Sequence, residues 1–120
     1  MLQHKEEIGR MDKRVTFQEP IYGTDASNQH KITGWQDIDT NPEVWANVEY
    51  TTGSEGFESD QLVAVKVAKI SVRYRTDLST THRAIVGSEI FNIHSIIEVG
   101  RKRFSKILGE FGGQYKETTT

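Results

Sequence analysis

The sequence contains no cysteine and no long hydrophobic run. Without cysteine among its 120 residues, the chain can form neither a disulfide framework nor a thiolate metal site. No apolar run approaches the ~20 residues of a membrane-spanning helix, and residues 1–14 are too polar for a signal peptide. These absences predict a soluble protein that is made in the cytoplasm and does not contact a membrane.

Motifs of catalysis and cofactor binding are also missing from the sequence. The four histidines are His4, His30, His82 and His94, and their spacing matches no common metal site. Asp37 and Asp39 alternate with Ile38 but lack the further acids and the central glycine of a calcium loop. The short stretch 53–56 lacks the lysine of a phosphate-binding loop. We therefore expect no enzymatic activity, no metal and no cofactor.

The size and composition predict one domain with polar ends. Hydrophobic residues make up only 35% of the chain, which is lean for a globular protein, so part of the chain is expected to be loop, tail or surface that depends on a partner. We expect a flexible N-terminal arm at residues 1–12, a β-domain at residues 13–111 and a flexible tail at residues 112–120.

Alternating apolar and polar residues predict a mostly β fold. The expected strands span residues 14–19, 34–38, 44–50, 63–75, 82–86, 89–99 and 103–111, with a loop at residues 22–33. Gly87 and Ser88 form a two-residue hairpin signal. We predict a small barrel or sandwich of six or so strands, with long loops and possibly one short helix.

The helix expectation concerns residues 51–61, where the alternation breaks. Ser54 could cap a short helix over residues 55–62, and a poorly ordered loop is the alternative. A second irregularity is a change of apolar parity near Ala68, which predicts a β-bulge or a strand that passes between two sheets.

The predicted core follows from shared strand parity. Its members are Val15, Phe17, Val48, Val72, Tyr74, Ile85, Phe91 and Ile93.

Charge is unevenly distributed although the net charge is only −2. Residues 32–65 contain seven acidic residues and no lysine or arginine, whereas residues 66–106 contain nine basic and three acidic residues. Such asymmetry favours complementary association between proteins. The simpler alternative is that both sets of charges lie on solvated strand faces.

The basic half also raises the alternative of a nucleic-acid-binding β-barrel. Cations alternate with aromatic residues at residues 73–75 and 101–104, as in single-strand binders. Against this alternative, the whole chain is slightly acidic, whereas dedicated binders are usually basic.

Four stretches of the sequence resemble a known family when they are taken in order. They are KRVTFQ at residues 13–18, WANVE at 45–49, GSEGF at 53–57 and ISVRYR at 70–75, the last followed by IFNI at 90–93. In these motifs the chain resembles the phage head–tail joining (head-closure) proteins of long-tailed bacteriophages. It departs from the family at Glu49, where proline is frequent, and in an acidic insert at residues 34–42.

The resemblance implies a structural virion protein that is made in the bacterial cytoplasm, encoded by a phage or prophage, and active without catalytic residues. It implies self-association into a dodecameric ring that contacts the portal or adaptor and the tail, closes the DNA-filled head, and lets DNA pass without binding it specifically. The isolated chain is expected to be a monomer. Another minor head or tail component is the alternative within the same class.

Two sets of residues are candidates for sites in such a ring. The candidate channel or gating loop is Gly53, Ser54, Glu55, Gly56, Phe57 and Glu58, and the candidate interface with a subunit or partner is Arg101, Lys102 and Arg103.

Overall fold

The computed structural model describes residues 9–24, 26–58 and 61–115, with the side chains of residues 52–65 left out. Every regular element in these residues is a strand, and the helix considered for residues 55–62 is wrong. The strands are β1 (Lys13–Thr24), β2 (His30–Asp37), β3 (Glu43–Glu58), β4 (Gln61–Arg73), β5 (Arg83–Val86), β6 (Glu89–Val99) and β7 (Phe104–Gln114).

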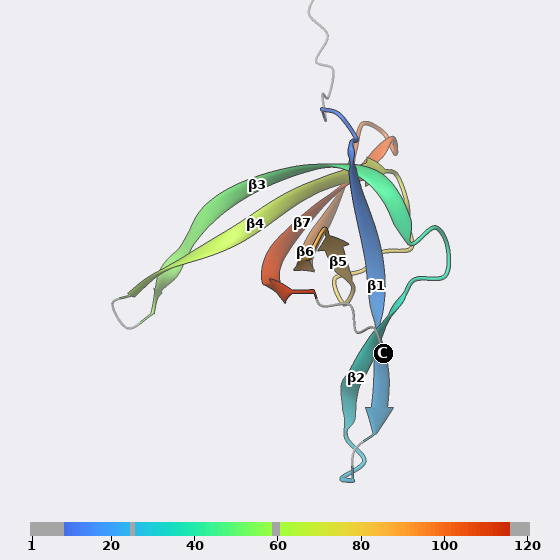
Figure 1. Ribbon diagram of the computed structural model, residues 1–120, viewed down its shortest axis with the longest axis vertical. Coiled ribbons are helices and arrows are strands. Elements are labelled where there is room, and N and C mark those ends of the chain that lie inside the picture. The colour runs from blue at the N-terminus through green and yellow to red at the C-terminus, as the bar shows by residue number, and fades with distance from the viewer. Residues whose placement is uncertain (1–8, 25, 59–60, 116–120) are drawn as a thin grey trace, which may run out of the picture.

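Six of the strands close into a ring-like antiparallel sheet (Figure 1). Neighbours pair in the order β1, β3, β4, β7, β6 and β5, and the pairing of β5 with β1 completes the circle, with Val15 opposite Val86. In this circle β7 stands opposite β1. The predicted strand-rich architecture is confirmed, and closure removes the free edges that an open sheet would expose.

β1 continues beyond the closed sheet by changing partners. Phe17 donates its N–H to the Pro42 carbonyl (2.8 Å) and accepts from the Ile38 N–H (3.2 Å), so its backbone faces the β2–β3 connection. Successive residues of a strand alternate in direction, and the nitrogen of Pro20 therefore faces the opposite edge, where pairing with β5 has ended at Gln18. A proline is tolerated at this position because it removes no ladder hydrogen bond.

The core fills the interior of the closed sheet. Val15, Phe17, Val72, Phe91 and Ile93 are all buried in it, as predicted. Val48 packs against the core while partly buried. Two predicted members differ, since Ile85 is buried outside this cluster and Tyr74 is only half-buried.

The parity change near Ala68 does not come from a bulge. The register of β4 is regular there against both β3 and β7. Pairing with β7 instead ends at Val67, so β4 leaves the closed sheet at this point and its environment changes. A register shift does occur between Ile93 and Ser95 in β6, and it changes the parity of the inward-facing residues. Ile93 and Ile96 therefore both contact the core, whereas Ile97 is 57% exposed.

Two hairpins project from the closed sheet (Figure 1). The β1–β2 arm comprises residues 19–37, and the β3–β4 arm comprises residues 51–66. The loop predicted for residues 22–33 is therefore wrong over most of its length, because a hairpin with two exposed faces carries little apolar alternation. The arms also explain the radius of gyration of 16.4 Å, against about 13.6 Å for a compact chain of this length.

Candidate assembly surfaces

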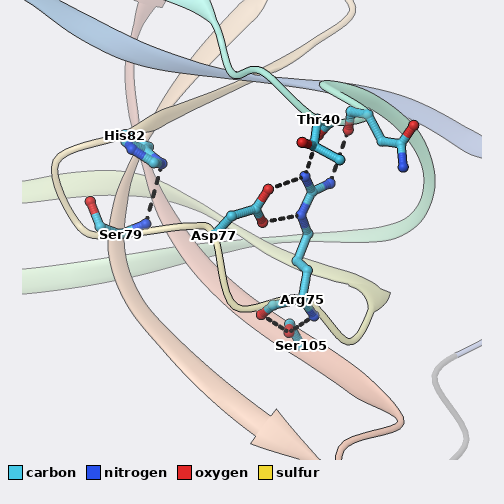
Figure 2. A network of polar contacts seen from close by, with 7 residues as sticks. Thr40, Arg75, Asp77, Ser79, His82 and Ser105 are labelled. Carbon is cyan, nitrogen blue, oxygen red and sulfur yellow. Dashed lines mark hydrogen bonds and ion pairs between the residues drawn. The ribbon is translucent and has the colours of Figure 1, made fainter.

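Arg75 fixes the connection that leads out of the β1–β2 arm (Figure 2). Its guanidinium donates to the carbonyls of Thr40 (2.7 Å) and Asn41 (3.0 Å), in the β2–β3 connection. The same group forms a two-point ion pair with Asp77 at 2.6 and 2.8 Å. Bidentate geometry and a side chain only 12% exposed make this a strong, well-ordered contact. The Arg75 hydrogen bonds hold the pKa of the Asp77 carboxyl below its usual value.

The backbone of Arg75 is anchored as well. Its N–H donates to the Ser105 hydroxyl (3.1 Å), which donates in turn to the Arg75 carbonyl (3.3 Å), and Ser105 is fully buried. A further turn is held by His82, whose Nδ1 accepts from the Ser79 N–H at 3.2 Å. Arg75 is therefore a structural residue. Its use inside the fold weakens the idea that residues 73–75 form a cation–aromatic surface for nucleic acid.

A second arginine holds the base of the β1–β2 arm. The Arg83 guanidinium lies 4.4 Å from the centre of the Trp35 ring and donates to Gln18 Oε1 at 2.9 Å. Gln18 donates in turn to Asp37 at 3.0 Å. Burial lowers the pKa of Arg83 from its usual value. With two arginines at its base, the arm is oriented by the body of the molecule before any partner arrives.

The distal part of the same arm carries exposed apolar side chains. Tyr22 and Ile32 lie directly opposite each other in the hairpin, and they are 55% and 48% exposed. Pro20 and Trp35 form the pair that lies two residues nearer the body along β1 and therefore on the same face. The sequence interpretation missed this strip because it placed residues 22–33 in a loop.

The base of the β3–β4 arm is held by an aromatic and charged cluster. Lys66 pairs with Glu89 at 2.6 Å and lies 4.9 Å from the centre of the Tyr50 ring. Tyr50 and Phe111 flank the buried Phe91 ring at 6.0 and 5.9 Å. Burial, and then the charge of Glu89, raise the pKa of Tyr50. The cluster links the arm to β6 and β7.

The predicted channel segment lies on this arm. Residues 53–58 belong to the distal part of β3 and pair with residues 61–65 of β4, with a register shift between Glu55 and Phe57. The loop alternative for these residues is therefore wrong, because their backbone forms a strand. Their side chains, including the carboxylates of Glu55 and Glu58, lie outside the described part of the structure.

The predicted basic interface lies in the turn between β6 and β7. Arg101, Lys102 and Arg103 are all exposed, and Arg101 and Lys102 have left-handed backbone angles (φ 54° and 65°). The Arg103 carbonyl accepts from the Tyr74 N–H at 3.0 Å, which fixes the turn to the end of β4. Among the described residues none of the three side chains forms an ion pair. Figure 1 shows this turn well apart from the far end of β3.

A cleft of about 630 Å³ opens between the start of β1, β3 and the β5–β6 turn. Three carboxylates line it, Asp12, Glu43 and Glu89. Glu43 and Glu89 are each paired with a cation, Arg14 at 2.9 Å and Lys66 at 2.6 Å. The hydrogen bond from Arg14 lowers the pKa of Glu43. These pairs tie neighbouring strands together and leave neither carboxylate as a free proton acceptor.

Within the described ranges there is no cluster of three His, Asp or Glu side chains that could hold a metal ion. No helix long and apolar enough to cross a membrane occurs in the same residues.

No curated protein sequence matches the chain. A chain of the virion of a native gene transfer agent particle is similar in structure, with a TM-score of 0.65 and 21% identity over 85% of this chain and 94% of that one. At this identity the likeness concerns the fold. The family model described as phage head completion protein matches residues 7–110. The chain thus belongs to the phage head completion protein family, whose members are structural proteins of the virion.

Proposed function

We propose that this protein forms a ring at the head–tail connector of a phage or related particle. The ring closes the DNA-filled head and provides the surface to which the tail attaches. The observation that carries the proposal is the family match over residues 7–110. The shape supports it, because a small closed sheet with two projecting hairpins is suited to contact several neighbours at once.

In this proposal the subunit meets its partners through charge as well as shape. Arg101, Lys102 and Arg103 contact acidic residues of a neighbouring subunit or of the portal or adaptor ring. Their exposure and lack of ion pairs among the described residues support this role. A single exposed pair contributes only about 0–1 kcal/mol, so the contacts set orientation when they are repeated around the ring. The isolated chain is a monomer that assembles on the portal.

The β3–β4 arm faces the channel in the same proposal. Its segment 53–58 contains Glu55 and Glu58, and residues 32–65 contain no lysine or arginine. Negative walls suit a channel that passes DNA, because cations would bind the phosphates and slow the strand. DNA passes near the protein without being bound specifically.

The test uses particles assembled with a variant chain. We expect the triple reversal Arg101→Glu, Lys102→Glu and Arg103→Glu to abolish incorporation into filled heads, which would then lose DNA and acquire no tails. The matched control reverses two other exposed cations, Arg10→Glu and Lys13→Glu, and should assemble normally. Quantitative mass spectrometry of purified heads measures incorporation.

Normal incorporation of the triple variant would remove the interface assignment. Absence of the wild-type chain from tailed particles would contradict the connector function itself. Tight, salt-sensitive binding of DNA by the wild-type chain, lost in the triple variant, would favour the nucleic-acid alternative.

A further inference from the structure

The outer face of β7 carries a small apolar groove with cationic flanks. The groove has a volume of about 180 Å³ and lies between β4, β6 and β7. Ile97 (57% exposed) and Leu108 form its apolar part, and Lys69 and Lys106 flank it. Neither lysine forms an ion pair among the described residues. A face of this kind fits an apolar side chain that is presented by an acidic segment.

The β1–β2 arm of this chain has the complementary properties. Tyr22 and Ile32 project from its distal face, and residues 19–37 contain three acids, Glu19, Asp25 and Asp37, against one lysine. Because Arg75 and Arg83 fix its base, the arm loses little conformational entropy on docking.

The two surfaces are also placed correctly for repeated association. The arm extends β1, and the groove is centred on β7, which stands opposite β1 in the closed sheet. One subunit can therefore offer its arm to one neighbour while it receives the arm of another in its groove. Such a heterologous contact is what a ring requires.

We infer that the β1–β2 arm of one subunit docks in the β4–β7–β6 groove of a second copy, with Tyr22 and Ile32 against Ile97 and Leu108. The inference rests on the proposed ring and adds to it the surfaces that join neighbouring subunits. Lys69 and Lys106 attract the acidic arm and set its direction.

The absence of cysteine allows a direct test by cross-linking. Two single variants, Ile32→Cys and Ile97→Cys, are mixed and oxidised, both as purified chains over a range of concentrations and in assembled particles. A disulfide requires Cα atoms about 4.4–6.8 Å apart, so linked dimers are expected only when both variants are present. The matched control pairs Ile97→Cys with Trp45→Cys, whose side chain is 54% exposed against 48% for Ile32 and lies near the start of β3, outside the arm, and should give no dimer.

A third sample adds Lys69→Glu and Lys106→Glu to the Ile97→Cys chain, and most of the linked dimer should be lost. Particles that contain both chains but show no dimer, or link through Trp45→Cys instead, would overturn the inference and leave the ring proposal intact. If particles lack the chain, the connector function fails, and the yield of dimer from the purified chains decides the docking by itself.

Discussion

At the scale of single residues, four arginines of the basic half divide into two kinds. Arg75 and Arg83 are partly buried and form hydrogen bonds inside the fold, where they hold the base of the β1–β2 arm in place. Arg101 and Arg103 are exposed and unpaired among the described residues. In the sequence all four belong to the same basic half, so charge alone could not separate structural arginines from those available to a partner.

The Arg75–Asp77 pair makes stability depend on acid. Because the folded pKa of Asp77 lies below its usual value of 3.8, the pair stabilises the fold above about pH 4, and this contribution is lost as the pH falls through the lower folded pKa. We expect the melting temperature of wild type to fall more steeply than that of Asp77→Asn between pH 5 and pH 3. The effect is small because the Asp77 side chain is 42% exposed.

The control for this acid dependence is Asp39→Asn, which removes a neighbouring carboxylate that forms no ion pair among the described residues. It should keep the wild-type slope. Identical slopes for all three proteins in thermal unfolding would show that the pair adds nothing.

At the scale of elements, the strands that line the core were predictable and the arms were not. Alternation of apolar and polar residues predicted β5, β6 and the Gly87–Ser88 turn between them, because each of these two strands buries one face. The extension of β1 to Thr24 and the start of β2 at His30 were missed because both faces of that hairpin are exposed. The pairing of β5 with β1 could not be predicted either, because no local sequence pattern indicates which distant strands pair.

The exposed residues proposed for binding were likewise only partly predictable from the sequence. The resemblance and the charge pattern gave Arg101, Lys102 and Arg103, which do lie exposed in a turn. Tyr22 and Ile32 stood in a polar stretch, and nothing local showed that they would face each other. Ile97 was indistinguishable from the core residue Ile96 until the register shift in β6 was known.

Gly109 of β7 is required by packing inside the sheet. A Cβ atom at this position would lie 2.9 Å from Cβ of Phe91 and 3.6 Å from the Asn92 carbonyl. Since the nearest atom is close to the backbone and cannot move freely, Gly109→Ala should lower the free energy of unfolding by about 1–3 kcal/mol.

Gly34→Ala is the matched control, because its Cβ would meet only Ile21 Cδ1 at 3.6 Å, an ordinary contact. Its effect should stay within about 0.5 kcal/mol. Urea unfolding followed by fluorescence measures both variants, and equal stability of the two would contradict the packing argument.

At the scale of the whole molecule, stability should differ between the closed sheet and the β3–β4 arm. In the β3–β4 arm, the described residues of the two strands pair only with each other. From Val67 to Arg73, by contrast, β4 also pairs with β7 within the closed sheet. We predict rapid amide exchange across residues 51–61 in the isolated chain and strong protection at Ile70 and Ile107. Hydrogen exchange with mass spectrometry checks this contrast, and equal protection of the two regions would contradict it.

Closure of the sheet also sets the order in which the protein can fold. Val15 pairs with Val86, so the last gap in the circle joins residues roughly 70 positions apart, and the entropy of that large loop must be lost before the contact forms. The two hairpin arms, by contrast, need only short loops. During synthesis β1 therefore cannot complete its pairing until β5 has left the ribosome. Folding should be slow, in the millisecond-to-second range of topologies rich in distant contacts. Until then the apolar faces of β1 and β3 stay uncovered, and nascent chains crowded on one messenger could pair with each other before each closes on itself.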